Sequence, residues 1–262
     1  MDEPWQRGAV LVTGGTGAIG LAIAREFLIR GATVAVSCSS ESGAVRAREA
    51  LYLYGDKAQA FIVDLDPANA AGLLLDVVQK AIGNISVLIN CAGLSFNKSI
   101  NDTSIVEYDN VMNLNLRAVF FASQVVSRQM IERKICGRII NITSGNYRYA
   151  RPNAAVYAAS KAALEMLTRS FSLEMGPHGI TVNAVAPGLV YQDSSINSEF
   201  RGVADYYSIN SPLGRIVQPQ EVASAVAFLA SEQAAAITGE TIVVDNGFSA
   251  GRFDFPRRTT QH

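Results

Sequence analysis

The stretch AVLVTGGTGAIG, residues 9–20, decides the fold, because an apolar run leads into a glycine-rich turn and then into a helix. Residues 9–13 are too few and too β-branched for a buried helix, so they predict a strand. The small residues of the turn let backbone N–H groups and the helix N-terminus approach a pyrophosphate closely. A plain tight turn is the alternative, but the place of this turn in the first strand–helix unit favours a dinucleotide site.

Short apolar runs and longer amphipathic segments alternate along the rest of the chain. Strands are predicted at 9–13, 33–37, 60–64, 87–90, 138–143, 181–186 and 240–245, and helices at 19–30, 41–54, 67–82, 104–134, 154–176 and 219–231. This alternation predicts βαβ units with right-handed crossovers. We therefore expect an α/β fold, a single doubly wound, Rossmann-like parallel sheet of about seven strands with helices on both faces, as one domain over residues 1–262.

Composition narrows the class of protein. Apolar residues make up 49% of the chain and charged residues 17%, which suits a sheet covered on both faces or extensive subunit contacts. A net charge of −1 offers no basic surface for nucleic acid. Three cysteines without C-x-x-C spacing and two dispersed histidines indicate no disulfide framework and no metal site. With no apolar leader at residues 1–8 and no stretch of membrane-span length, we expect a soluble, cytoplasmic protein.

Residues 188–212 interrupt the alternation. They are rich in Gly, Ser, Asn and Asp, show weak periodicity and follow the predicted strand 181–186. A long irregular insertion after the carboxyl end of a strand is typical of a lid over a substrate, so we expect a mobile lid here.

Tyr157 and Lys161 form a Y-x-x-x-K pair in the predicted helix 154–176, and this spacing places both side chains on one face. A phenol titrates near 10 in water and needs a nearby cation to act as an acid–base catalyst at neutral pH, which Lys161 is placed to supply. Taken alone, the pair is equally explained by an ordinary tyrosine and a solvated lysine on an amphipathic helix.

Other polar residues support a site near this pair. Ser144 follows the predicted strand 138–143 and Asn90 ends the strand 87–90, so both are expected at the carboxyl edge of the sheet, where open α/β sheets bind ligands. Asn115 lies inside the predicted helix 104–134, where an amide is unfavourable unless it has a specific partner. A buried amide bonded to backbone is the alternative for Asn115.

Together these motifs resemble the short-chain dehydrogenase/reductase family over about residues 8–250. The motifs, in the order and spacing of that family, are TGGTGAIG (13–20), NCAG (90–93), Asn115, Ser144, Y-x-x-x-K (157–161), Pro187-Gly188 and G-x-x-x-x-V-D-x-G (239–247). The pattern is most similar to 3-oxoacyl-(acyl-carrier-protein) reductases, including the spacing from Ser144 to Tyr157. Ala18 and Gln192 depart from the usual glycine and threonine, which affects the anchoring of the cofactor and not the catalytic residues.

The resemblance implies a catalytic tetrad of Asn115, Ser144, Tyr157 and Lys161. Tyr157 would give its proton to the substrate carbonyl oxygen, and Lys161 would lower the pKa of that phenol and hold the nicotinamide ribose. Ser144 would donate a hydrogen bond to the substrate oxygen, and Asn115 would anchor a water between Lys161 and solvent. The cofactor-binding residues that it implies are Gly14, Thr16, Gly17, Ile19, Gly20, Ser37, Ser39, Ser40, Asp64, Leu65, Asn90, Ala92, Gly93, Tyr157, Lys161, Pro187, Gly188, Val190 and Gln192.

The choice of cofactor depends on SCSS (37–40), at the end of the second predicted strand. NAD-specific members of the family carry an acid there to bind the adenosine ribose, and this chain has none. The hydroxyls of Ser37, Ser39 and Ser40 accept a 2′-phosphate without repelling it, so NADP(H) is preferred and NAD(H) stays an alternative. Gly17 stands where some NADP enzymes have an arginine.

These features predict an NADP(H)-dependent oxidoreductase that transfers a hydride between nicotinamide and the carbonyl or hydroxyl group of a small molecule. One alternative is a 3-oxoacyl-(acyl-carrier-protein) reductase of fatty-acid synthesis, which Ile135 and His178 disfavour because carrier-binding relatives tend to have arginines there. The other is a catalytically silent NADP-binding scaffold, which the intact tetrad disfavours.

Two further expectations concern the surface. The candidates for the pocket mouth are Tyr147, Arg148, Tyr149 and Arg151, which lie between the catalytic serine and tyrosine. Helices 104–134 and 154–176 carry more apolar residues than one face of a sheet can cover, so we expect them to pair across two-fold axes in a homotetramer.

Overall fold

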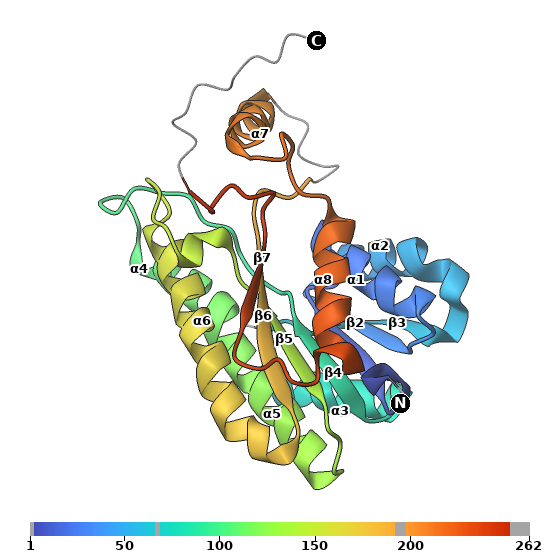
Figure 1. Cartoon of the computed structure of the whole chain (residues 1–262). Coiled ribbons are helices and arrows are strands. Elements are labelled where there is room, and N and C mark those ends of the chain that lie inside the picture. Colours follow the sequence, from blue (N-terminus) through green and yellow to red (C-terminus); the bar gives the residue numbers. More distant parts are fainter. Residues whose placement is uncertain (1–2, 66–68, 192–197, 252–262) are drawn as a thin grey trace.

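The computed structural model of the chain describes residues 3–65, 69–191 and 198–251. Within these ranges, parallel strands form a seven-stranded sheet in the order β3-β2-β1-β4-β5-β6-β7 (Figure 1). The strands are β1 (Ala9–Thr13), β2 (Val34–Cys38), β3 (Ala58–Ile62), β4 (Ile85–Asn90), β5 (Arg138–Ile142), β6 (Thr181–Pro187) and β7 (Thr241–Val244). With helices on both faces, this is the doubly wound sheet that the sequence predicts, and the predicted fold class is confirmed.

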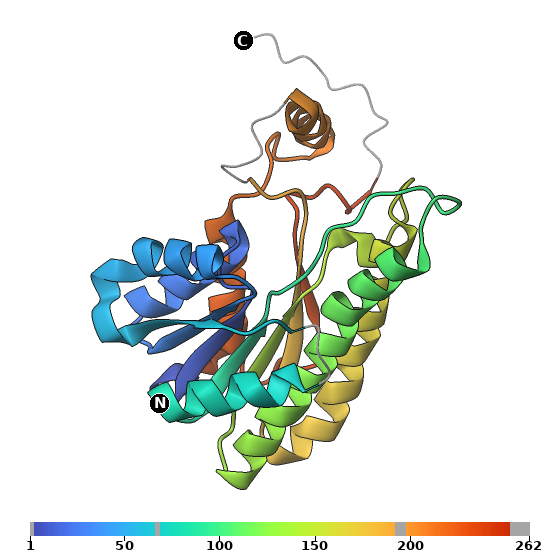
Figure 2. The same cartoon turned by 180° about the vertical axis from the view of Figure 1, so that it is seen from behind.

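Two groups of helices cover the sheet, one on each face, as Figures 1 and 2 show from opposite sides. One group is α1 (Ala18–Ile29), α2 (Glu41–Leu51) and α8 (Pro219–Ala230), and the other is α3 (Ala70–Ile82), α5 (Ala118–Glu132) and α6 (Ala155–Met175). Side chains of β1 alternate between the two cores. Val10 and Val12 pack with the first group and Leu11 with the second, as the two-residue period of a strand requires.

The order of the strands places a topological switch point between β1 and β4, because the chain runs outward from β1 to β3 on one side and from β4 to β7 on the other. The side chain of Thr13 joins the two strand ends, where its Oγ1 accepts hydrogen bonds from the backbone N–H groups of Cys91 (3.1 Å) and Ala92 (3.2 Å). Ligands of open α/β sheets bind at this point, outside the carboxyl ends of the strands.

The long helix predicted at 104–134 is divided in the structure. α4 (Ile105–Met112) and α5 are joined by a π-helical turn at Asn113–Arg117. Such turns are rare and often mark functional sites, and this one contains Asn115. The amphipathic period continues through the turn, which is why the sequence shows one segment.

The expectation of an irregular lid at 188–212 is wrong for residues 198–210, which form the helix α7 (Ser198–Asn210). α7 stands above the carboxyl edge of the sheet, away from both layers of helices (Figure 1). α7 is less apolar than α1, α5 and α6, because a helix that does not pack on the sheet needs no broad apolar face. Residues 192–197 lie outside the described part of the chain.

Two features are absent from residues 3–65, 69–191 and 198–251. There, no helix has both the length and the hydropathy to cross a bilayer. The same residues contain no group of three or more His, Cys, Asp and Glu side chains placed to hold a metal ion.

Candidate active site

A cavity of about 1550 Å³ lies along the carboxyl edge of the sheet and extends beneath α7. Its lining falls into two parts. Residues within segments 14–20, 37–39 and 63–65 line the glycine-turn half, and residues within segments 142–161, 200–210 and 248–251 line the tyrosine half. Residues 91–97 and 187–190 lie between them along the same cavity.

The glycine turn brings backbone close to backbone and leaves the start of α1 open to the cavity. Gly14 has φ +63°, and a Cβ there would lie 2.6 Å from Cα of Ala92. At Gly20 a Cβ would lie 2.5 Å from the carbonyl oxygen of Gly14. Gly17 is the N-cap of α1, has no side chain over the first turn, and a Cβ there would meet nothing closer than 3.9 Å. The free N–H groups of this helix end, with no acid in the first turn, favour an anion.

The serines after β2 have different surroundings. Ser37 is 1% exposed, lines the cavity, and its Oγ has no hydrogen-bond partner within the described ranges. Ser39 is exposed and also lines the cavity. Ser40 lies outside the cavity lining. It is the N-cap of α2, where its Oγ accepts a hydrogen bond from Gly43 N (3.2 Å). Of the three serines predicted to bind the cofactor, Ser37 and Ser39 line the cavity and Ser40 does not.

Most of the other residues predicted to hold a cofactor also line the cavity. These are Gly14, Thr16, Gly17, Ile19, Gly20, Asp64, Leu65, Ala92, Gly93, Tyr157, Lys161, Pro187, Gly188 and Val190. Gln192 lies outside the described residues.

The side chain of Asn90, which the sequence predicts to bind the cofactor, is buried and is not part of the cavity lining. Its Nδ2 donates hydrogen bonds to Ser123 Oγ (3.0 Å) on α5 and to Asn141 Oδ1 (2.9 Å) on β5. Asn90 has the same parity along β4 as Leu88, which packs in the core beneath α5. The period of the strand therefore turns this amide inward, where it ties β4 to its neighbours.

Three residues of the predicted tetrad meet in the tyrosine half. Ser144 follows β5, while Tyr157 and Lys161 lie one turn apart on α6, and all three line the cavity. The hydroxyl of Ser144 lies near the Tyr157 phenol and lowers its pKa. Lys161 is buried and its Nζ donates to the carbonyl oxygen of Ile142 (3.0 Å), 5.9 Å from the centroid of the Tyr157 ring.

The protonation of this group is set mainly by burial. Desolvation raises the pKa of Tyr157, while the Ser144 hydroxyl and the charge of Arg151 oppose that rise. The net shift is upward, so burial outweighs the lowering expected from Lys161, whose Nζ donates to Ile142 O. Burial also lowers the pKa of Lys161 to about 8. At neutral pH Tyr157 is therefore a phenol and Lys161 is still a cation.

Asn115 lies next to this group without lining the cavity. Its Oδ1 accepts from Leu94 N (2.7 Å), and its Nδ2 donates to Leu94 O (3.1 Å) and to Ser160 Oγ (3.1 Å). The backbone-bonded alternative is therefore the one observed. A Cβ on Gly93 would lie 3.3 Å from Asn115 Oδ1 and 3.4 Å from Lys161 Nζ, so Asn115 fixes the loop that packs against Lys161.

Comparison with known proteins identifies the family. The family described as enoyl-(acyl carrier protein) reductase matches residues 15–249. A short-chain dehydrogenase/reductase of Armillaria gallica is 36% identical over 245 residues, covering 90% of this chain and 94% of that protein. The chain belongs to the short-chain dehydrogenase/reductase family.

Other members of this family show how far the likeness extends. The 3-oxoacyl-(acyl-carrier-protein) reductase of Haemophilus influenzae is 36% identical over 238 residues, covering 90% of this chain and 96% of that protein. Among solved structures, a gluconate 5-dehydrogenase from Burkholderia cenocepacia in complex with NADP and tartrate has a TM-score of 0.85 at 30% identity, over 93% of this chain and 96% of that one. This short-chain dehydrogenase/reductase is therefore an oxidoreductase with the predicted architecture.

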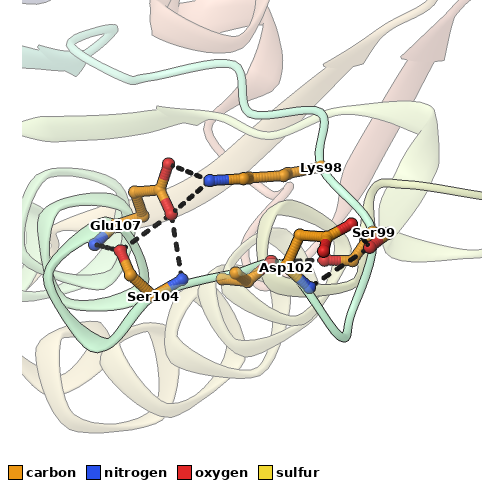
Figure 3. A network of polar contacts seen from close by, with 6 residues as sticks. Lys98, Ser99, Asp102, Ser104 and Glu107 are labelled. Atoms are coloured by element: carbon orange, nitrogen blue, oxygen red, sulfur yellow. Dashed lines mark hydrogen bonds and ion pairs between the residues drawn. The ribbon is translucent and has the colours of Figure 1, made fainter.

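One wall of the cavity in this short-chain dehydrogenase/reductase is a loop after β4 that is held at several points (Figure 3). The Nζ of Lys98 contacts both carboxylate oxygens of Glu107 (2.8 and 2.9 Å), and Ser104 caps α4 in a capping box with the same carboxylate. These donors lower the pKa of Glu107 to about 2. Backbone N–H of Lys98 donates to Asn153 O (2.7 Å), which ties the wall to the loop before α6.

An aromatic cluster that the sequence did not predict closes the tyrosine half. Tyr207 of α7 stacks on Phe248, which follows β7, with ring centroids 4.3 Å apart. Tyr206 and Tyr149 also approach Phe248, at 6.2 and 6.1 Å. The cluster joins three segments that are distant in the sequence, and only the aromatic residues within 188–212 could have hinted at it.

Of the four residues proposed for the pocket mouth, Tyr149 and Arg151 line the cavity. Arg151 Nη2 donates to Asn97 Oδ1, across the opening from the β4 loop. Tyr147 and Arg148 lie outside the lining. The guanidinium of Arg148 lies over the ring of Tyr147, 5.4 Å from its centroid.

Proposed function

We propose that this short-chain dehydrogenase/reductase uses NADP(H) to interconvert a carbonyl compound and its alcohol, with Tyr157 exchanging a proton with the substrate oxygen. The observation that carries this proposal is that Ser144, Tyr157 and Lys161 share one cavity with the glycine turn. The nicotinamide, when bound, supplies or accepts the hydride.

The glycine-turn half suits a phosphorylated dinucleotide. Gly17 leaves the first turn of α1 open for a pyrophosphate, with Gly14 and Ile19 beside it. Ser37 has a buried hydroxyl that finds no partner among the described residues, and Ser39 lies next to it with no acid in SCSS, so both are suited to a 2′-phosphate. The NADP complex of the gluconate 5-dehydrogenase agrees with this choice.

The roles of the side chains follow from their protonation. Tyr157 is a phenol at neutral pH and can give its proton to a carbonyl oxygen as that carbon is reduced. Ser144 turns its hydroxyl proton from Asn146 Oδ1 to the same oxygen and so stabilises its developing charge, while the backbone N–H of Asn146 still donates to Ser144 Oγ. Lys161, still cationic at neutral pH, stabilises the phenolate that remains. Asn115 acts through the loop at Leu94, as a positioning residue.

α7 and the aromatic cluster are suited to act as the substrate lid of a single catalytic domain. Tyr206 and Tyr207 of α7 line the cavity, together with Phe248. Their contacts tie α7 to the segment after β7, so a substrate must pass between these elements. This arrangement supports the position that we propose for the lid, around 188–212.

Measuring NADPH oxidation with a broad panel of ketones and aldehydes tests the proposal. We expect carbonyl-dependent oxidation that is faster with NADPH than with NADH. Binding of NADPH without turnover on any compound would overturn the proposal in favour of a silent NADP-binding scaffold.

A second candidate is a 3-oxoacyl-(acyl-carrier-protein) reductase, favoured by the 36% identity to the Haemophilus influenzae protein over nearly its whole length. The two candidates differ in whether an acyl-carrier protein delivers the substrate. Reduction of an acyl-carrier-protein-bound substrate at least about tenfold faster than its small-thioester analogue would favour this candidate.

The free thiols Cys38, Cys91 and Cys136 suit a reducing compartment, and we propose the cytoplasm as the site of action. Fractionation of cells that make the protein tests this. Recovery of the protein from an oxidising compartment would contradict it.

Self-association is proposed from the outer surface of α5 and α6. Phe120 and Phe171 meet at 5.5 Å between ring centroids, so the two helices form one surface. On it Met166 is 60% and Leu173 80% exposed, which is unusual for large apolar side chains. We propose a homotetramer with two-fold interfaces. Light scattering at micromolar concentration should give four times 28.0 kDa, and a mass of one chain contradicts the proposal.

A further inference from the structure

Two buried polar atoms in the cavity lining have no hydrogen-bond partner within the described ranges, and they lie in opposite halves of the cavity. These atoms are Oγ of Ser37 and Nδ2 of Asn146. Ser37 belongs to the glycine-turn half, where the proposed dinucleotide accounts for it. Asn146 belongs to the tyrosine half, and none of the steps described so far uses it.

Asn146 is fixed against the catalytic serine. It lies in a short 3₁₀ turn (Gly145–Tyr147) directly after Ser144 and is 8% exposed. Its Oδ1 accepts from Ser144 Oγ, and its backbone N–H donates to the same Oγ, both at 3.3 Å. One end of the amide is therefore held by Ser144, and the other end has no partner in residues 3–65, 69–191 and 198–251. Exchanging nitrogen and oxygen leaves one end without a partner as well.

The neighbouring polar side chains already have partners. Arg151 Nη2 donates to Asn97 Oδ1, and the hydroxyl of Tyr149 lies near that of Tyr207, which raises the pKa of Tyr149. A buried N–H without a partner costs free energy, which a ligand oxygen at this position recovers. Asn146 thus keeps a buried N–H in the tyrosine half for which the described residues offer no partner.

We infer that Asn146 is a specificity-determining residue that binds a second oxygen of the substrate. Because the amide is small and bonded to Ser144, this oxygen lies close to the reacting carbonyl oxygen, on the adjacent carbon or the one after it. The substrate class is therefore α- or β-oxygenated carbonyl compounds, with the corresponding diols in the reverse direction. The inference rests on the proposed function, because it takes the reacting oxygen to lie between Ser144 and Tyr157.

Two matched pairs of ketones test this inference, each differing only by a hydroxyl in place of a methyl group. The pairs are hydroxyacetone with 2-butanone, and 4-hydroxy-2-butanone with 2-pentanone. In at least one pair the wild-type enzyme should favour the hydroxyl compound by at least about tenfold in kcat/KM with NADPH. Asn146→Leu, which keeps the volume and the backbone N–H but removes the amide, should abolish that preference.

Controls separate specificity from other effects. Loss of alignment at Ser144 lowers kcat for both members of a pair, so the ratio between them isolates the second oxygen. Asn210→Leu is the matched control, because Asn210 also lines the cavity but its Nδ2 donates to Tyr206 O (2.8 Å), and the ratio should not change. Asn146→Ala serves if the leucine variant does not fold.

The outcomes distinguish the inference from the function on which it rests. A wild-type enzyme without the preference, or an Asn146 variant that keeps it, overturns the inference and leaves the proposed function intact. Reduction of other carbonyl compounds, without reduction of either hydroxyl ketone, also overturns the inference and leaves the proposed function intact. Failure to reduce any carbonyl compound overturns the proposed function itself.

Discussion

The two halves of the cavity are built differently. The glycine-turn half comes from the ends of β1, β2 and β3, where backbone atoms and small side chains line the space. The tyrosine half combines a loop after β5, the helix α7 and the segment after β7, and side chains close it. The contrast indicates that a cofactor common to the family is held by the strand ends of the sheet, whereas a substrate is selected by the loops and helices placed on the sheet.

Cys38→Asp should have the largest effect on one half of the cavity while leaving the other half unchanged. Cys38 lines the glycine-turn half at the end of β2, and a carboxylate there repels a 2′-phosphate and binds a ribose diol. We expect kcat/KM with NADPH to fall about a hundredfold, NADH to become the better cofactor, and KM for the carbonyl substrate to stay unchanged. Cys136→Asp, on an exposed cysteine outside the cavity, is the control. An unchanged cofactor preference in Cys38→Asp contradicts this assignment.

The strands of the sheet were largely predictable from the sequence. Every predicted strand lies within two residues of the observed one, because short β-branched runs bounded by turns leave little choice. The positions of Tyr157, Lys161 and Ser144 also followed from spacing and strand ends.

The sequence does not show the partners that only the folded chain brings near to a side chain. Asn90 turns inward to Ser123 and Asn141, and Ser40 caps α2. Asn115 bonds to the backbone of Leu94, twenty-one residues earlier in the chain. The contact of Tyr207 with Phe248 joins segments whose approach no local pattern encodes.

The tyrosine half should also respond to pH through Lys161, whose pKa is lowered to about 8 by burial. Its neighbour Cys91, with a pKa raised to about 12, stays a neutral thiol in this range. The cation that stabilises the Tyr157 phenolate is present below about pH 8 and is lost above it. We expect kcat/KM for carbonyl reduction to fall about tenfold per pH unit above that point.

The profile of kcat/KM against pH checks this expectation. Lys161→Met should have low activity with no break near pH 8, since it has no cation to lose. A wild-type profile that stays level from pH 7 to pH 10 would argue against a role for the Lys161 charge.

The smallest effect is expected from Phe248→Ala, which removes the stacking with Tyr207 and opens the tyrosine half. An aromatic pair contributes about 0.5–1.5 kcal/mol, so KM for the carbonyl substrate should rise about three- to tenfold. The Kd for NADPH should not change. Phe228→Ala, on a half-exposed phenylalanine of α8, is the matched control. Equal losses in KM and in NADPH binding would show that the halves are not separable.

The central claim, that Tyr157 transfers the proton in a cavity whose other half binds NADP(H), is tested most directly in one variant with two readouts. Tyr157→Phe keeps the ring and removes the hydroxyl. Fluorescence titration should give an NADPH Kd within about threefold of wild type, while kcat for carbonyl reduction falls at least about a hundredfold. Turnover at the wild-type rate in Tyr157→Phe would contradict the account.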